Sequence, residues 1–365
     1  MPLEHGKISF QICRIVEELP ENCLELLSKH SGGSLNKLSE EPEIAWVSGR
    51  HLLESRIDEE TATRSGYPFV SLRKAELKVP ASLLQAQCKM EELALMQAED
   101  KDRISRKEKK EIKDSVIESL LPTMPPTISG TQCLIDPTNA TLYIASASLN
   151  KIETCLKKFK EAVGVEVVPL IPDTIVPDLL EISANSLPLL NFSSARTEES
   201  ASGDLAQDFL TWLWFFQETH GGTIKVQDQE EFAIVVGDPL RFIGGEESGS
   251  EESVLKKGTP TLSPEAQAAL EAGKKLNKAG IILAQGEDIW TFSFDAKNFC
   301  FAGMSLPDGE ELDPESKFQE RVLFLRTFQK IILSLFKSFI HKLHDPEKRK
   351  KLSEEIKKWT AERSI

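Results

Sequence analysis

Hydrophobic and polar positions alternate along some stretches of the chain and recur every three to four residues along others. Alternation is typical of a strand with one buried face, and the longer spacing is typical of a helix with an apolar stripe. In the first half the pattern predicts strands at 7–15, 44–47, 69–79, 133–135, 141–147 and 165–170. It predicts helices at 19–30, 82–121 and 149–163, the second of them divided in two near 100–105.

The second half combines short strands with helices that carry clear start signals. Strands are predicted at 223–226, 231–236, 281–284, 289–294 and 299–304. The pair Ser263-Pro264 predicts the start of a helix, which we expect to run to about Ala279. The pair Asp313-Pro314 opens the C-terminal helices, whose apolar residues recur at helical spacing until the break at 344–346.

This order of elements predicts an α+β fold with antiparallel sheets and a long helical insertion. We expect a central α+β region at 1–80 and 128–192, an inserted basic helical arm at 81–127, a second α+β region at 205–306 and C-terminal helices at 307–365. The stretch 193–204 has the composition of a linker, and 244–253 predicts an acidic, flexible loop. The aromatic run LTWLWFF favours a buried core, because base stacking requires exposed rings beside basic residues.

Composition adds two expectations about the class of protein. With 365 residues and 40 % hydrophobic content the chain can bury a sizeable core. The six cysteines are spread singly and form no C-x-x-C pair, which favours free thiols in a reducing cytosol over a zinc site or redox motif. The N-terminus lacks a secretory pattern, and charged residues interrupt the apolar stretch 322–343, so we expect a cytoplasmic protein without a membrane span.

The charge of the segment Lys101 to Pro122 is opposite to that of the whole chain. Its first thirteen residues carry seven basic and three acidic side chains, a local charge of +4, whereas the chain carries −14. Two further basic patches are the pair Lys256-Lys257 and the run 348–351 with Lys357 and Lys358. Each patch can be read as a binding surface for a negative partner or as a solvated face. Ion pairs predicted between Asp102 and Arg106 and between Lys107 and Glu111 favour the second reading for the first patch.

The sequence contains none of the common catalytic motifs. A G-x-x-x-x-G-K-[ST] loop, a G-x-G-x-x-G turn, an H-E-x-x-H pair and a G-x-S-x-G elbow are all missing. His341 and His344 lie three residues apart but have no third ligand nearby, so we expect solvated histidines, no metal and no cofactor. Turn chemistry explains Asp136 and Asp173 beside their prolines. A carboxylate site assembled from distant segments stays open, because sequence does not reveal such a site.

Several runs in fixed order resemble the recombination-associated protein family RdgC. They are KAELKVPASLLQAQ, SRKEKKEIKDSVIESLLP, LIDPTNATLYIASAS, EVVPLI and, later, LEAGKKLNKAGIIL. The resemblance is good over about 66–172 and patchy over 1–50 and 254–306, and the last fifty residues have no clear counterpart.

The resemblance implies a ring-shaped homodimer through which double-stranded DNA passes without sequence preference. It also implies that the bound protein limits access of the RecA recombinase to DNA, in the cytoplasm at the nucleoid. Carried over by position, the DNA-binding residues are those of a basic helix and a basic loop: Arg103, Arg106, Lys107, Lys109, Lys110, Lys113, Lys256 and Lys257.

The chain departs from the family pattern after the basic helix. The family commonly continues with an arginine and an aromatic residue that helps to close the ring, whereas this chain reads Thr123-Met124-Pro125-Pro126. Met124 and Pro125 are therefore the candidates for dimer closure here. We expect a non-catalytic DNA-binding protein. The alternatives are a DNA exonuclease with a dispersed carboxylate metal site and a protein-interaction module whose basic helices dock an acidic partner.

Overall fold

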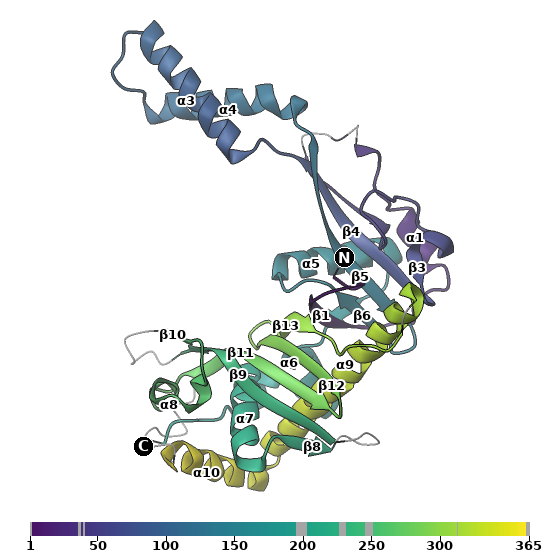
Figure 1. Ribbon diagram of the computed structural model, residues 1–365, viewed down its shortest axis with the longest axis vertical. Coiled ribbons are helices and arrows are strands. Elements are labelled where there is room, and N and C mark those ends of the chain that lie inside the picture. Colours follow the sequence, from purple (N-terminus) through teal and green to yellow (C-terminus); the bar gives the residue numbers. More distant parts are fainter. Residues whose placement is uncertain are drawn as a thin grey trace. The chain divides into compact units, whose positions relative to one another are not determined.

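The computed structural model describes residues 2–35, 38, 41–194, 203–225, 231–244, 251–311 and 313–362 (Figure 1). Most of the predicted linker at 193–204 and of the acidic loop at 244–253 lies outside the described residues. The chain forms two compact units: unit 1 comprises Met1–Pro20, Arg64–Pro68 and Gln132–Ile365, and unit 2 comprises Glu21–Thr63 and Phe69–Thr131. The four-part division expected from the sequence stays a prediction.

Unit 2 contains a small antiparallel sheet from which a helical hairpin extends. Its elements are α1 (Cys23–Ser28), β2 (Glu43–Ser48), α2 (Glu59–Ala62), most of β4 (Tyr67–Leu77), α3 (Ala81–Ala98), α4 (Arg106–Leu120), the 3-10 turn η2 (Leu121–Thr123) and the first part of β5 (Pro126–Asp136). β2 pairs with β4 from Glu43 opposite Ala75 to Ser48 opposite Val70. The expected break in the long helical run is present, since α3 ends at Ala98 and α4 begins at Arg106.

Unit 1 is built on a larger antiparallel sheet in the order β10-β9-β11-β12-β13-β1-β6-β5. Its strands are β1 (Ile8–Ile15), β3 (Thr63–Arg64, shared with unit 2), β6 (Thr141–Ile144), β7 (Val167–Pro169), β8 (Thr223–Lys225), β9 (Glu231–Ile243), β10 (Glu252–Leu255), β11 (Lys275–Gln285), β12 (Asp288–Asp295) and β13 (Cys300–Ser305). Its helical elements are α5 (Leu149–Val163), α6 (Pro172–Leu180), η3 (Ala184–Ser186), α7 (Leu205–His220), η6 (Pro260–Leu262), α8 (Pro264–Glu271), α9 (Pro314–His344) and α10 (Pro346–Glu362).

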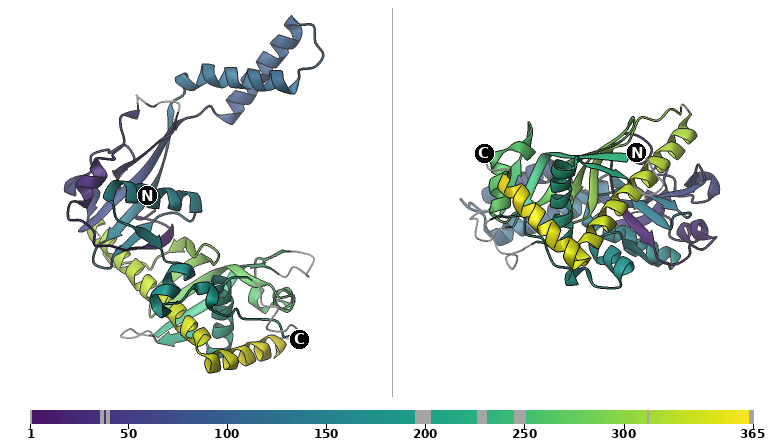
Figure 2. Two further views of the ribbon diagram at one scale, coloured as in Figure 1. Left: turned by 180° about the vertical axis from the view of Figure 1, so that it is seen from behind. Right: turned by 90° about the horizontal axis from the view of Figure 1, so that it is seen from below.

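Helices α7, α9 and α10 lie on one side of the β9–β13 part of this sheet (Figure 2). The aromatic run of α7 is buried, as expected for a core segment: Trp212 and Trp214 are both at most 1 % exposed. The Phe209 ring lies 5.1 Å from that of Phe336 on α9, and the Trp214 ring lies 5.2 Å from that of Trp359 on α10. The C-terminal helices, which have no clear counterpart in the RdgC resemblance, are therefore part of the core of unit 1.

Two ion pairs, each with a buried carboxylate, join distant segments of unit 1. Asp208 of α7 pairs with Lys275 of β11, and both side chains are at most 4 % exposed. Burial raises the pKa of the Asp208 carboxyl, and Lys275 opposes that shift. Asp136, at the end of β5, accepts two hydrogen bonds of 2.6 Å from the Arg326 guanidinium of α9. Asn139 donates to the same carboxylate through its side chain at 2.8 Å, so the expected turn is present and the turn carboxylate also holds α9.

One predicted helix is wrong at its C-terminal end. The helix that begins at Pro264 ends at Glu271 rather than near Ala279. Gly273 follows with φ +77°, a left-handed conformation that ends a helix at little cost for glycine. Leu276, Ala279 and Ile281 are then buried on one face of β11.

The molecule is thus an α+β protein with a large antiparallel sheet and a helical hairpin inserted between β4 and β5. All six cysteines, each within the described residues, are free thiols, and only Cys88 is not buried.

Candidate nucleic-acid interface

The basic segment folds as the second helix of the hairpin in unit 2. Ser105 is the N-cap of α4: its hydroxyl accepts a hydrogen bond of 3.2 Å from the Glu108 backbone N–H. The Glu108 carboxylate accepts one of 2.7 Å from the Ser105 backbone N–H. This capping box fixes where α4 begins, and it therefore fixes which face of the helix each basic side chain occupies.

Lys101 closes the loop that precedes α4. Its ammonium group contacts the carboxylates of Glu99 at 2.5 Å and Glu108 at 2.9 Å. These contacts raise the pKa of Lys101. Lys101 and Ser105 together lower the pKa of Glu108 to about 2. Lys101 therefore holds the loop in place and is already neutralised by its neighbours.

Two predicted DNA-binding residues of α4 are also engaged by carboxylates. Lys107 pairs with Glu111 one turn later at 3.8 Å, as the sequence predicts. Lys109 pairs at 3.4 Å with Glu92 of α3, so it joins the two helices of the hairpin. The other predicted pair is wrong: Asp102 and Arg106, both described, form no ion pair, because α4 begins only at Arg106 and the i,i+4 spacing does not apply.

The remaining basic residues of the segment are exposed and have no carboxylate partner within the described part of the chain: Arg103, Arg106, Lys110 and Lys113. The last three are spaced i, i+4 and i+7 on α4, which places them within an arc of about 60° and over about 10.5 Å of helix axis. We call these three residues the cationic stripe. It is the only group among the described residues of α4 in which three consecutive positions on one face are unpaired cations.

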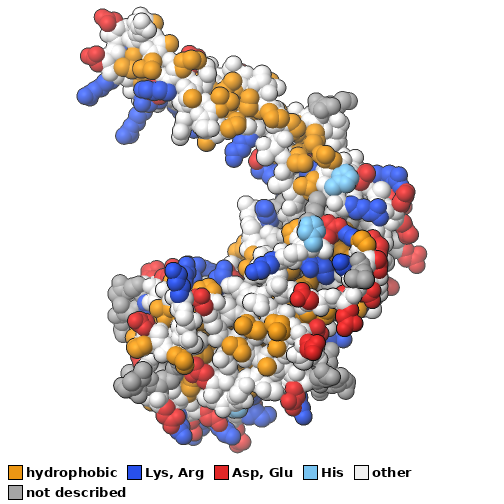
Figure 3. Space-filling model, in the orientation of Figure 1, with side chains coloured by type: hydrophobic (Ala, Val, Ile, Leu, Met, Phe, Trp, Pro, Cys, Tyr) orange, Lys and Arg blue, Asp and Glu red, His pale blue; other side chains and the backbone are white. Residues whose placement is uncertain are grey.

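The hairpin is held by few apolar contacts. Val116 is the one buried residue of α4, and no residue of α3 is buried. Three large apolar side chains of α3 are exposed: Leu83 (39 %), Met90 (55 %) and Leu93 (52 %). Figure 3 shows basic and hydrophobic side chains together over α3 and α4. The hairpin therefore presents both a cationic surface and an unfilled apolar one.

The structure leaves the predicted closure residues untested. Met124 follows η2, donates its backbone N–H to Leu121 and is half-buried, whereas Pro125 is exposed. Their role in a dimer stays a prediction.

The second predicted patch lies in unit 1, in the turn that follows β10. Lys256 and Lys257 are both exposed. Lys257 has φ +70° and the next residue, Gly258, has φ +72°. The Lys257 backbone N–H donates a 3.1 Å hydrogen bond to the Asp238 carboxylate of β9, which ties the turn to the sheet. The pair is therefore held on a defined turn.

The sequence analysis missed two further cations near this turn. Lys278 of β11 lies opposite Arg241 of β9 and opposite Asp295 of β12. Arg241 pairs with Glu252 of β10 at 2.7 Å. The alternation of β11 would have revealed Lys278, but the sequence analysis assigned this stretch to a helix.

The third basic patch, on α10, is largely neutralised. Lys348 contacts Asp345 at 3.1 Å, Lys351 contacts Glu355 at 3.8 Å, and Lys358 contacts Glu362 at 3.6 Å. This pattern is typical of a solvated helix face.

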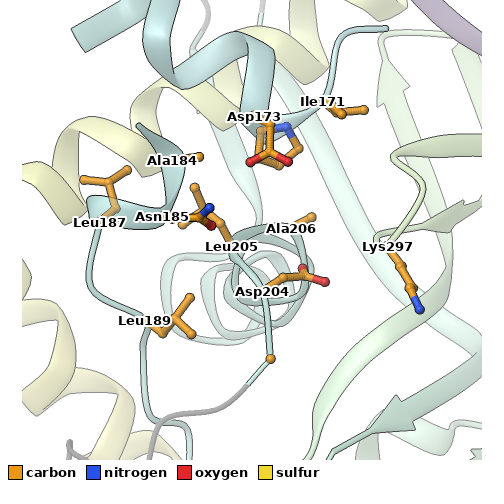
Figure 4. Close-up of a pocket in the computed structure, with 12 residues that line it drawn as sticks. Ile171, Asp173, Ala184, Asn185, Leu187, Leu189, Asp204, Leu205, Ala206 and Lys297 are labelled. Atoms are coloured by element: carbon orange, nitrogen blue, oxygen red, sulfur yellow. The ribbon is translucent and has the colours of Figure 1, made fainter. Parts of the chain in front are cut away.

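A cavity of about 230 Å³ lies in unit 1 where α6 and α7 begin (Figure 4). Asp173, Asp204 and Lys297 line it among mostly apolar residues. Asp204 caps α7 by accepting a 2.8 Å hydrogen bond from the Gln207 backbone N–H. The lining carries two carboxylates and one ammonium group, so the cavity does not favour a phosphate.

Neither a metal centre nor a membrane span is found in the described ranges. No three His, Cys, Asp or Glu side chains there lie close enough together to hold a metal ion. None of the helices there combines the length and apolar composition needed to cross a bilayer.

Fold and surface thus define a class of protein: an α+β chain whose helical hairpin carries an exposed cationic stripe. A family model described as "Putative exonuclease, RdgC" matches residues 40–177, which include the whole hairpin. Residues 40–177 are thus similar to the RdgC family, which confirms the resemblance found in the sequence over that range.

Curated relatives carry the same family name. The chain is 26 % identical over 190 residues to the recombination-associated protein RdgC of Yersinia enterocolitica, which covers 52 % of this chain and 57 % of the relative. It is 24 % identical over 213 residues to that of Pseudoalteromonas translucida (58 % and 56 %) and 30 % identical over 117 residues to that of Salmonella paratyphi B (32 % and 38 %). The chain thus matches between 38 % and 57 % of the length of these relatives.

Proposed function

We propose that this protein binds double-stranded DNA through the phosphate backbone, without sequence preference and without catalysis, and acts in recombination. The observation that carries the proposal is the cationic stripe of Arg106, Lys110 and Lys113, exposed and unpaired on a chain of net charge −14. The relatives are named recombination-associated proteins, which supports this setting.

The stripe has dimensions suited to one DNA strand. It extends over about 10.5 Å and carries three long basic side chains, so it can contact up to about three neighbouring phosphates of one strand. Contacts between Lys or Arg and phosphate position a protein on the duplex but carry no sequence information. Binding through the stripe is therefore expected on any duplex.

The proposal includes a homodimer that closes around DNA, with Met124, Pro125 and the exposed apolar side chains of α3 as the closure surface. A closed ring would convert weak contacts into long residence, because escape requires opening. It would also cover the duplex, limit access of a RecA-type recombinase and keep the protein at the nucleoid. The acidic remainder of the surface would discourage DNA from binding outside the ring.

Fluorescence anisotropy tests DNA binding directly. Labelled duplexes of unrelated sequence should bind with equal affinity and release the protein as salt rises. Circular DNA bound at low salt should resist a salt challenge longer than linear DNA of the same sequence, from which a ring can slide. Absence of duplex binding at low salt would refute the proposal, and equal release from both forms would refute the ring alone.

The second candidate is a DNA exonuclease, favoured by the description of the matching family model. Incubation of end-labelled duplex with magnesium separates the two functions. Shortening of the DNA that stops on addition of chelator would support the exonuclease, and intact bound DNA would support the binding protein.

A further inference from the structure

The cavity in unit 1 where α6 and α7 begin combines apolar walls with a few polar groups (Figure 4). Leucine and alanine side chains form most of the apolar wall, among them Leu187, Leu189 and Leu205. The polar groups are the side chains of Asp173, Asn185, Asp204 and Lys297. A concave, mostly apolar site with a small number of polar groups is the usual form of a binding site for a small molecule.

The polar side chains of this cavity have unused capacity for a ligand. Asp173, Asn185 and Lys297 form no side-chain ion pair or hydrogen bond with any other residue in the described ranges. All three are exposed, so a ligand can reach them from solvent. Asp204 uses its Oδ1 atom to accept a 2.8 Å hydrogen bond from the Gln207 backbone N–H, and its second carboxylate oxygen has no partner within the same ranges.

The two carboxylates of the cavity come from the starts of two helices. Asp173 lies in the first turn of α6, and Asp204 is the N-cap of α7. The N-terminus of a helix is the positive end of its dipole and stabilises a carboxylate. The fold therefore places two negative charges beside one apolar cavity.

Lys297 supplies the one positive charge among the residues that line the cavity, and it lies on the tight turn between β12 and β13. The Phe299 backbone N–H closes this turn by donating a 3.0 Å hydrogen bond to the Ala296 carbonyl. In the view of Figure 4, Lys297 lies on the opposite side of the cavity from Asn185, and Asp204 lies between them. The positive charge is therefore held at one end of the site.

The charges and the size of the cavity together define a class of ligand. Two carboxylates require two cationic groups, the Lys297 ammonium requires an anionic group, and the leucines require an aliphatic segment. An α-amino acid with a basic side chain combines all of these features in one small molecule. A cavity of about 230 Å³ is smaller than the roughly 300–1,000 Å³ of pockets for drug-sized molecules, so it suits a single amino acid.

We propose that this cavity binds a free basic amino acid, lysine or arginine. Lys297 pairs with the α-carboxylate of the ligand, Asp173 and Asp204 pair with its two cationic groups, and the methylene stem lies against the leucines. The proposal goes beyond the proposed function, because the cavity shares no residue with the cationic stripe and its occupancy does not require DNA.

Isothermal titration calorimetry on the full chain without DNA tests the site with three matched probes. L-lysine carries all the groups that the cavity requires, L-norleucine lacks the side-chain ammonium, and L-lysinamide lacks the carboxylate. Lysine should bind at least about tenfold more tightly than either analogue, because each analogue leaves a charged group of the site without its partner. L-arginine should bind as lysine does.

Two variants assign the groups of the ligand to residues. Asp173→Asn should weaken lysine binding at least about tenfold. Lys297→Met should weaken it similarly and should make lysine and lysinamide bind equally, because no cation is left to distinguish the carboxylate from the amide. Lys151→Met is the matched control, because Lys151 is an exposed lysine of α5 in the same unit and does not line the cavity.

A wild-type protein that binds neither lysine nor arginine at millimolar concentration would overturn the proposal. Equal binding of lysine, norleucine and lysinamide would overturn it as well, because such binding would not depend on the charges of the cavity. Lysine binding that is unchanged in both variants would place the ligand elsewhere and would refute the assigned site. None of these results affects the proposed binding of DNA.

Discussion

Neutralising the cationic stripe should remove most of the affinity for DNA while leaving the hairpin folded. The variant carries Gln at Arg106, Lys110 and Lys113, which keeps helix propensity nearly unchanged. The capping box of Ser105 and Glu108 and the buried Val116 are untouched, so circular dichroism should not change. Any loss of affinity for DNA is then due to the missing phosphate contacts.

The magnitude follows from counterion release. Each phosphate contact contributes about 0.9 to the slope of log affinity against log salt, which at 0.1 M salt corresponds to about 1.2 kcal/mol. Loss of the three contacts therefore weakens binding by about 3.7 kcal/mol, or roughly 500-fold, for each copy that contacts the DNA. The salt slope should become less steep by about 2.7 for each such copy.

Fluorescence anisotropy on a labelled duplex, titrated from 50 to 200 mM salt, measures both quantities. The matched control carries Gln at Lys348, Lys351 and Lys358, which changes the net charge equally but removes cations already paired on α10. The control should retain affinity within a few-fold. Equal losses in the two variants would show that net charge, and not the stripe, governs binding.

Three further predictions concern the stability of unit 1. Lys275→Met leaves the buried Asp208 carboxylate without its ion-pair partner and should lower the free energy of unfolding in urea by about 3–5 kcal/mol. Adding Asp208→Asn should restore most of the loss. An unchanged free energy of unfolding in the single variant would contradict a stabilising role of the buried pair. Arg326 lowers the pKa of Asp136 against the opposing effect of burial, so the pair stabilises the protein above pH 4 and less as the pH falls below it. The stability difference between wild type and Arg326→Met should therefore shrink with acid, and a constant difference would show that the pKa of Asp136 does not depend on Arg326. Trp359→Ala should lower the free energy of unfolding by about 3–5 kcal/mol, because α10 is part of the core. A decrease below about 1 kcal/mol would show that α10 does not belong to the core.

Local signals in the sequence predicted much of the local structure. Leu149–Val163 was predicted with the bounds that α5 has, because its apolar stripe has an unbroken helical period. The break between α3 and α4 and the helix start at Pro314 were predicted from residues within one turn of each boundary. The helix α8 was predicted too long because the alanines and lysines after Glu271 fit either a helix or a strand. The left-handed conformation of Gly273 ends the helix there.

The site could be predicted only in part, because pairing depends on segments that the fold brings together. Sequence spacing revealed Lys107 with Glu111, but not Lys109 with Glu92, which lies on the other helix of the hairpin. Charge alone therefore did not separate the unpaired stripe from the neutralised lysines. The cavity likewise becomes visible only in the fold, because α6, α7 and the turn between β12 and β13 lie far apart in the sequence.

The salt dependence of duplex binding by the wild-type protein tests the central claim most directly. Four unpaired cations per copy, Arg103 and the stripe, give about eight phosphate contacts in a homodimer and a slope of log affinity against log salt near −7. The account predicts this slope on duplexes of unrelated sequence. A slope near zero, or a steep preference for one sequence, would contradict it.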